Sequence, residues 1–194
     1  MAQRIEIRFE GLGGQGIVLA SVVLAEALGV YQGLEAVQTS VYDPETRGAS
    51  VRSEVVASPE QVNYPGALRP DVIVAMSQKA ADNSSQLAEG GVLIVDPLFV
   101  KRVPVVGGRV YRVPVTELAD QVGRRQTANM VMLGALARFV PIVSMESLEK
   151  SVAARAPKGT AELNLAKPGS YTIFHEYESV VGSRIYSGDR KSVV

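Results

Sequence analysis

The sequence contains no cysteine among its 194 residues. This absence excludes disulfide bonds, thiolate metal sites, cysteine nucleophiles and iron–sulfur ligation by this chain. A net charge is also lacking, because twenty Lys and Arg residues balance twenty Asp and Glu residues. No global field therefore favours nucleic acid or an acidic membrane surface as a partner.

Long hydrophobic runs are missing as well. The N-terminal segment MAQRIEIRFEG has no apolar stretch of the kind found in signal peptides. The most apolar segment, ANMVMLGALARFVPIV, is interrupted by Arg138 and Pro141 and is too short to cross a bilayer comfortably. We therefore expect a cytoplasmic protein without a membrane-spanning segment.

Catalytic side chains are scarce. The single histidine, His175, lies in a polar segment near the C-terminus, where a solvated surface position is expected. No Ser-His-Asp set and no metal-ligand spacing can be recognised. Asp71 and Asp96 flank predicted strands, and Asp96 precedes a proline, which is typical of a turn. The sequence predicts no catalytic residue and no metal ligand.

Two hydrophobic periodicities alternate along the chain. Strands are predicted at 4–10, 34–42, 51–58, 70–77, 90–96 and 108–115. Helices are predicted at 15–29 (ending at Gly29 or Gly33), 78–87, a short segment capped by Thr116, 128–140, a segment from Ser144 to Arg155, 160–166 and 170–181. This order predicts a Rossmann-like α/β fold with a mainly parallel sheet and helices on both faces. Residues 1–194 are expected to form a single domain, with 182–194 as a flexible tail.

The segment GLGGQG at 11–16 joins the first predicted strand to the first predicted helix. Gly11, Gly13 and Gly16 match the spacing G-x-G-x-x-G, which lets an anion approach backbone N–H groups at a helix N-terminus. A dinucleotide site also requires an acid at the end of the second strand. Asp43 stands near that position but precedes Pro44 in a turn. The glycines could therefore serve anion binding, dinucleotide binding or close helix–strand packing alone.

Several segments resemble one family. GLGGQGIVLAS, SVYDPETRGASVRSEVVAS, DVIVAMSQKAAD, EGGVLIVD, ANMVMLGAL and SMESLEKSV occur in the order and spacing seen in the gamma subunit of 2-oxoacid:ferredoxin oxidoreductases. The resemblance covers about residues 4–165 and is strongest to the 2-oxoglutarate or general 2-oxoacid type. The related indolepyruvate enzyme usually has a loop closer to Q-R-G-G, where this chain has Glu45-Thr46-Arg47-Gly48-Ala49.

The resemblance implies an accessory subunit of an enzyme that decarboxylates a 2-oxoacid, transfers the acyl group to coenzyme A and passes electrons to ferredoxin. Thiamine diphosphate, Mg²⁺ and iron–sulfur clusters are then expected only on partners, namely alpha and beta subunits, with a ferredoxin-like delta subunit as a further candidate. Coenzyme A is the ligand expected at this chain. Its predicted contacts are Gly11, Gly13, Gly14, Gln15, Gly16, Arg47 and Gly48. The alternatives are a purely structural assembly subunit and a stand-alone nucleotide-binding protein.

Two predicted helices, 15–29 and 128–140, are apolar nearly all round. A single apolar stripe is sufficient to pack a helix on a sheet, so the excess predicts contact with partner subunits. The alternative is that later helices of the same domain, 145–155 and 170–181, cover the second face.

Overall fold

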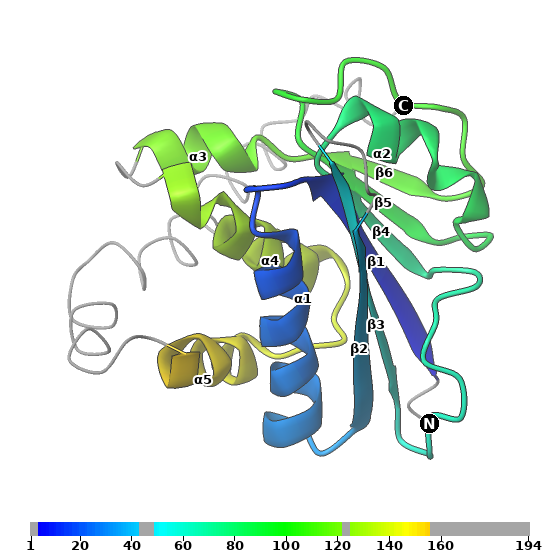
Figure 1. Ribbon diagram of the computed structural model, residues 1–194, viewed down its shortest axis with the longest axis vertical. Coiled ribbons are helices and arrows are strands. Elements are labelled where there is room, and N and C mark those ends of the chain that lie inside the picture. Colours follow the sequence, from blue (N-terminus) through cyan, green and yellow to red (C-terminus); the bar gives the residue numbers. More distant parts are fainter. Residues whose placement is uncertain (1–3, 43–48, 122–124, 156–194) are drawn as a thin grey trace.

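The computed structural model describes residues 4–42, 49–121 and 125–155 of the chain (Figure 1). In chain order the elements are β1 (Ile5–Leu12), α1 (Ile17–Glu26), the π-helical turn η1 (Ala27–Tyr31), β2 (Glu35–Tyr42), β3 (Ser50–Ser58), β4 (Val72–Ala75), α2 (Gln78–Asp82), the 3-10 turn η2 (Ser84–Gln86), β5 (Val92–Val95), β6 (Arg109–Arg112), α3 (Val115–Gln121), the 3-10 turn η3 (Arg125–Thr127), α4 (Ala128–Phe139) and α5 (Met145–Arg155). The helices predicted at 160–166 and 170–181, the predicted tail and His175 lie outside the described residues.

The strands of the described part form a six-stranded sheet in the order β2-β3-β1-β4-β5-β6. β1, β4, β5 and β6 pair with one another in parallel, whereas β3 is antiparallel to both β1 and β2. β2 therefore points the same way as β1, and only β3 is reversed. The predicted single-domain α/β fold with a mainly parallel sheet is confirmed.

Helices cover both faces of the sheet, as predicted, but unequally. α1, α3, α4 and α5 pack on one face, where Ile7, Phe9 and Leu133 are completely buried. On the other face, α2 and the segment after β5 cover Ile73 and Leu93 in a smaller apolar cluster. Figure 1 shows α1, α4 and α5 on one side of the sheet and α2 on the other. β4 and β5 are apolar throughout because both of their faces are covered.

Two charged side chains of β1, those of Arg8 and Glu10, are buried as well. Phe9 faces the larger core, whereas the neighbouring Arg8 faces the opposite side and is only 3% exposed. Arg8 Nε donates to Glu54 Oε1 on β3 over 2.8 Å, and Arg8 Nη2 donates to the Ala67 carbonyl over 2.7 Å. The loop 59–71 thus covers this face. Burial of the arginine is tolerated because its hydrogen bonds and its counter-charge are provided locally.

The helix ends follow the predictions in two places. Gly33 has a left-handed backbone (φ 73°) and ends the helical segment that continues from α1 through η1, which matches the later of the two predicted ends. Ser144 caps α5 as predicted, because its Oγ accepts a hydrogen bond from the Ser147 N–H over 3.1 Å.

The prediction that Thr116 caps a helix is wrong. α3 begins at Val115, and the Thr116 N–H donates to Asp96 Oδ2 over 3.0 Å. Asp96 also accepts the Leu98 N–H at Oδ1 over 2.9 Å, so the predicted turn acid does form a turn. N–H groups in the first turn of a helix have no partner within the helix. The buried Asp96 carboxylate, just after β5, accepts one of these N–H groups of α3, that of Thr116.

The prediction that helix 128–140 faces a partner is also not supported by the geometry. Residues 131–136 of α4 are buried inside the domain, where α4 contacts α1, α3 and α5. At the end of α4, Phe139 stacks on Tyr111 of β6 with ring centroids 4.0 Å apart. The excess apolar surface of α4 is therefore used within the domain, which is the alternative expected from the later helices.

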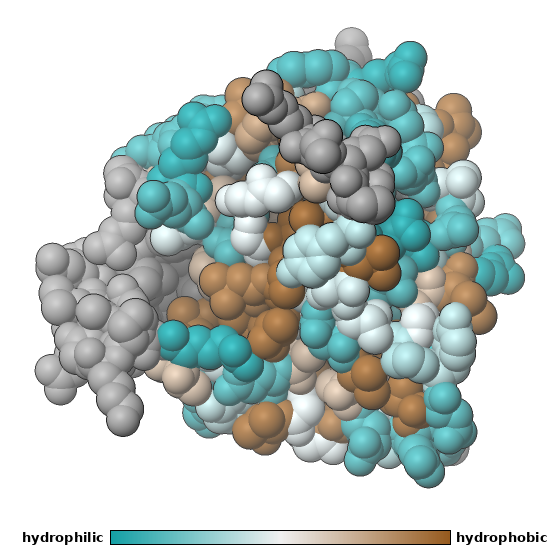
Figure 2. Space-filling view, viewed as in Figure 1, coloured by the Kyte–Doolittle hydropathy of each residue, from teal (hydrophilic) through white to brown (hydrophobic). Residues whose placement is uncertain are grey.

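α1, by contrast, keeps some apolar surface open. Leu19 is 48% exposed, and Val18 and Val22 are half-buried beside it. Figure 2 shows hydrophobic residues gathered near the middle of this face of the molecule, over α1. Of the two helices predicted to face partners, only α1 retains a surface that fits this prediction.

Candidate functional site

The loop GLGGQG connects the carboxyl end of β1 to α1 and is held by short backbone contacts. The Gln15 N–H donates to the Leu12 carbonyl over 3.2 Å, which closes a tight turn. The Gly13 N–H donates to the Ala49 carbonyl over 3.1 Å and ties the loop to the start of β3. Gly16 then takes a left-handed conformation (φ 72°) as the N-cap of α1. Ala49 contributes only its backbone carbonyl to this contact, which therefore does not depend on its side chain.

The side chain of Gln15 links β1 to β4. Its Oε1 accepts the Leu12 N–H over 2.7 Å, and its Nε2 donates to the Met76 carbonyl over 2.8 Å. β1 and β4 are parallel neighbours whose following helices lie on opposite faces of the sheet. Ligands of open α/β sheets usually bind at such a switch point. In this protein the Gln15 side chain lies at the switch point, and its amide oxygen and nitrogen are both hydrogen-bonded within the protein.

Gly11 and Gly16 leave room for the amide side chains of Gln15 and Asn129. A Cβ atom on Gly11 would lie 2.5 Å from Gln15 Oε1 and 2.9 Å from Ile17 Cδ1. A Cβ atom on Gly16 would overlap the side-chain amide of Asn129, which donates to the Gly16 carbonyl over 3.3 Å. Asn129 is 3% exposed at the start of α4. At these two positions, glycine is required by packing within the protein.

Gly13 and Gly14 face open space instead. Among the described residues, the atom nearest to a Cβ on Gly13 would be the Ala49 carbonyl oxygen at 3.9 Å, and a Cβ on Gly14 would meet nothing within 4 Å. Both residues are exposed. Gly14 needs to be glycine for its backbone, which is left-handed (φ 86°), and Gly13 has no such requirement.

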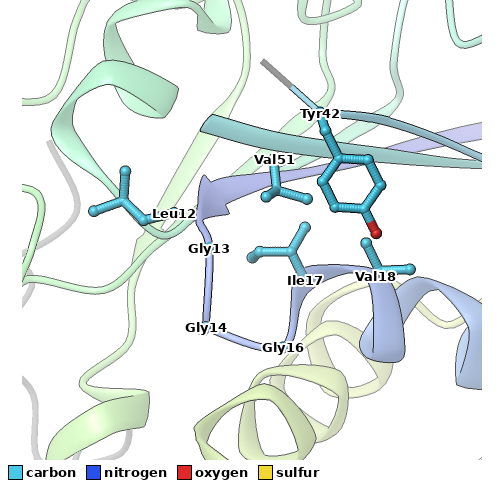
Figure 3. Close-up of a pocket in the computed structure, with 8 residues that line it drawn as sticks. All are labelled: Leu12, Gly13, Gly14, Gly16, Ile17, Val18, Tyr42 and Val51. Carbon is cyan, nitrogen blue, oxygen red and sulfur yellow. The ribbon is translucent and has the colours of Figure 1, made fainter. Parts of the chain in front are cut away.

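A pocket of about 330 Å³ lies between this loop, the first turn of α1 and the ends of β2 and β3 (Figure 3). It is lined by Leu12, Gly13, Gly14, Gly16, Ile17, Val18, Tyr42 and Val51. Tyr42 and Val51 are cross-strand neighbours of β2 and β3. Figure 3 shows the Tyr42 ring and the side chains of Val51, Ile17 and Val18 converging, while Leu12 points away from them. The pocket therefore combines apolar walls with a backbone edge of glycines.

The electrostatics of the pocket come from the backbone. Gly16 is the N-cap residue of α1, and no side chain of the described residues accepts a capping hydrogen bond there. The first turn of α1 also contains no acidic residue. The N–H groups of Gly14 and Gly16 donate to no acceptor in the part of the chain that the structure describes. Free N–H groups and the positive end of the helix dipole favour a negatively charged group at this edge. The ion pairs Arg8–Glu54 and Arg52–Glu10 lie on the opposite face of the sheet.

The structure thus divides the predicted site residues into three groups. Gly13 and Gly14 line the pocket with open space beside them. Gly11 and Gln15 are engaged within the protein, and Gly16, which also lines the pocket, makes room for Asn129. Arg47, Gly48 and Asp43 lie outside the described residues.

Several residues that shape the site were not among the predicted contacts: the pocket-lining Leu12, Ile17, Val18, Tyr42 and Val51, and Asn129 behind Gly16. Asn129 is a polar residue in an otherwise apolar segment, and this isolated polarity was a signal of a specific hydrogen bond. Among residues 4–42, 49–121 and 125–155, no cluster of His, Cys, Asp or Glu could hold a metal ion. The same residues contain no helix with the length and apolar content needed to cross a membrane.

Fold and site together define an α/β domain with a glycine-rich loop beside an open pocket at a helix N-terminus. A family model described as pyruvate ferredoxin/flavodoxin oxidoreductase matches residues 6–167. The chain is 46% identical over 166 residues to the 2-oxoglutarate synthase subunit KorC of Methanocaldococcus jannaschii, covering 84% of this chain and 89% of that protein. The chain belongs to the pyruvate ferredoxin/flavodoxin oxidoreductase family.

Two further relatives agree. KorC of Methanothermobacter thermautotrophicus is 43% identical over 170 residues, covering 84% of this chain and 90% of that protein. The crystal structure of the keto/oxoacid ferredoxin oxidoreductase gamma subunit from Geobacter sulfurreducens matches with a TM-score of 0.75 and 37% identity, covering 90% of this chain and 99% of that one. The gamma-subunit resemblance expected from the sequence is confirmed.

Proposed function

We propose that this chain is the gamma subunit of a thiamine-diphosphate-dependent 2-oxoacid:ferredoxin oxidoreductase of the 2-oxoglutarate type. Such an enzyme converts a 2-oxoacid, coenzyme A and oxidised ferredoxin into acyl-CoA, CO₂ and reduced ferredoxin. The observation that carries the proposal is the similarity to two KorC subunits of 2-oxoglutarate synthase along about nine tenths of their length. Because the similarity extends over nearly the whole length of these subunits, it supports the role of a whole subunit rather than that of a shared fragment.

The subunit has an accessory role in this proposal. The chain has no cysteine with which to hold a cluster. Thiamine diphosphate, Mg²⁺ and the iron–sulfur clusters belong to alpha, beta and delta-type partners, ferredoxin is the electron acceptor, and the complex is cytoplasmic. This chain contributes to coenzyme A binding and to assembly, with the exposed side of α1 as a candidate contact.

The glycine edge of the pocket is the proposed phosphate site for coenzyme A. The backbone N–H groups of Gly14 and Gly16 and the first turn of α1 provide donors, and Gly13 leaves space for the ligand. Gln15 acts indirectly, because its two hydrogen bonds hold the loop in shape. Gly11 acts in the same way, by making room for Gln15. Arg47 and Gly48 complete the proposed set, with Arg47 pairing with a phosphate or a partner carboxylate.

The first test asks whether the chain is needed. The alpha and beta partners are purified with and without this chain, and 2-oxoglutarate-dependent, coenzyme A-dependent dye reduction is measured. We expect activity only in the complete complex. Full activity and stable partners without the chain would contradict the proposal.

The second test separates ligand binding from bracing. Gly13→Val places a side chain in the open space beside the loop, and we expect it to raise the KM for coenzyme A roughly tenfold, the equivalent of one charge-assisted hydrogen bond. The KM for the 2-oxoacid serves as the control. An unchanged coenzyme A requirement in a correctly assembled complex would favour the purely structural subunit. Arg47→Ala, measured in the same assay, tests the arginine.

A stand-alone dinucleotide-binding protein is the less favoured function. Gln15 closes the switch point between β1 and β4 where a dinucleotide would cross the sheet. Glu35, the other acid near the second strand, lies at the opposite end of β2 from the loop. Binding of NAD⁺ by the isolated chain, measured by calorimetry, is expected to be undetectable.

A further inference from the structure

Tyr42 is an exposed aromatic residue at the mouth of the pocket. It ends β2 and is 62% exposed. In Figure 3 its ring points toward Ile17 and Val18, and its hydroxyl lies at the end of the ring nearest to Val18. An aromatic ring held over an open apolar pocket leaves a large favourable contact area unused until a ligand or partner covers it.

The walls of the pocket restrict the chemistry of that ligand. The lining provided by the described residues consists of four aliphatic side chains, three glycines and Tyr42, so among them the tyrosine hydroxyl is the only polar side-chain group. A ligand part with several amide or hydroxyl groups would lose hydrogen bonds to water and find few replacements. A planar aromatic ring needs only flat apolar contacts, and its polar edge can stay in the solvent at the open mouth.

The size of the pocket and its glycine edge narrow the choice further. At about 330 Å³ it is near the lower limit for small-molecule sites, so it accepts one part of a cofactor rather than a whole one. The glycines proposed to hold phosphate line the same pocket as Tyr42. An aromatic base joined to phosphates fits this combination, whereas the pantetheine arm of coenzyme A, with its two amides, does not.

We propose that Tyr42 stacks on the adenine ring of coenzyme A and holds it against Ile17, Val18 and Val51. This inference rests on the proposed function and adds the part of the ligand that this subunit binds. The substrate thiol, at the far end of coenzyme A, then extends away from this chain toward the partners that hold the thiamine. Tyr42 is a binding residue in this scheme, with no role in bond making or breaking.

The test compares two acyl acceptors in the assembled complex. Coenzyme A carries the adenine, whereas phosphopantetheine has the same thiol arm without it. Tyr42→Ala is expected to lower kcat/KM for coenzyme A about tenfold, from the loss of one base–aromatic stack, and to leave kcat/KM for phosphopantetheine unchanged. Tyr42→Phe, which keeps the ring, is expected to behave like the wild type. Adenosine bisphosphate is expected to inhibit the wild type competitively and Tyr42→Ala about tenfold more weakly.

Tyr64→Ala is the matched control, because Tyr64 is also exposed (52%) but belongs to the loop that covers the opposite face of the sheet. Assembly of each variant is checked by size-exclusion chromatography. Equal losses for both acceptors in Tyr42→Ala, or no loss for either, would overturn the inference while leaving the proposed function intact. A wild-type complex whose activity does not depend on coenzyme A would instead overturn the proposed function itself.

Discussion

Residues 11–16 contain four glycines, and within the described part of the chain two of them face protein whereas the other two face open space. Gly11 lies against the half-buried amide side chain of Gln15, and Gly16 lies against the buried one of Asn129. Gly13 and Gly14 have almost nothing beside them within the part of the chain that the structure describes. The same residue type, within six positions, thus serves packing in one case and access to the pocket in the other.

This difference shows why the spacing G-x-G-x-x-G is a weak indicator of function. The spacing is met by Gly11, Gly13 and Gly16, and only Gly13 has open space at its side-chain position. The packing interpretation is therefore correct for the outer two glycines, and a ligand interpretation remains available for the inner two. Substitutions of Gly11 or Gly16 should mainly lower stability, whereas substitutions of Gly13 should leave stability nearly unchanged and mainly weaken ligand binding.

Gly16→Ala should have the largest effect on stability. Its φ of 72° is strained for alanine, and the added methyl group overlaps Asn129. We expect a loss of about 3 kcal/mol in the free energy of unfolding, measured by urea denaturation. The double variant Gly16→Ala/Asn129→Ala relieves the overlap but keeps the backbone strain. Its loss should therefore be smaller than the sum of the two single losses.

Gly11→Ala should have an intermediate effect, because its backbone is not left-handed and only the overlap with Gln15 and Ile17 opposes the methyl group. We expect a loss of about 2 kcal/mol. Gln15→Ala alone should cost about 1–2 kcal/mol, since it leaves the Leu12 N–H and the Met76 carbonyl without their partner. The double variant Gly11→Ala/Gln15→Ala tests whether the two positions are coupled. Strictly additive losses in the free energy of unfolding would show that glycine at position 11 is not needed to make room for the Gln15 side chain.

Gly13→Ala should have the smallest effect on stability, within about 0.5 kcal/mol of the wild type. Its backbone is not left-handed, and of the described residues the new methyl group meets only the Ala49 carbonyl at 3.9 Å. Thermal unfolding by calorimetry measures this. A destabilisation as large as that of Gly11→Ala would remove the distinction between the inner and outer glycines.

Much of the fold follows from local patterns in the sequence. The alternation around Phe9 predicts β1, the uninterrupted apolar runs predict β4 and β5, and the left-handed Gly33 ends the first helical segment where glycine was expected. These features depend on residues a few positions apart, whose geometry is set by the backbone itself. The family resemblance likewise follows from short motifs in a fixed order, and the comparisons confirm it.

What only the tertiary structure decided are contacts between residues far apart in the chain. Gln15 bonds to Met76, Asn129 to Gly16, and Asp96 to Thr116, and in each case the partner is brought near by the sheet or by helix packing. Helix 128–140 is apolar nearly all round because the domain surrounds it, which its own periodicity does not reveal. The sequence alone determined which elements form and to which family the chain belongs. Which glycines face the pocket was decided by the folded chain, because space beside a Cα atom depends on neighbours that only folding provides.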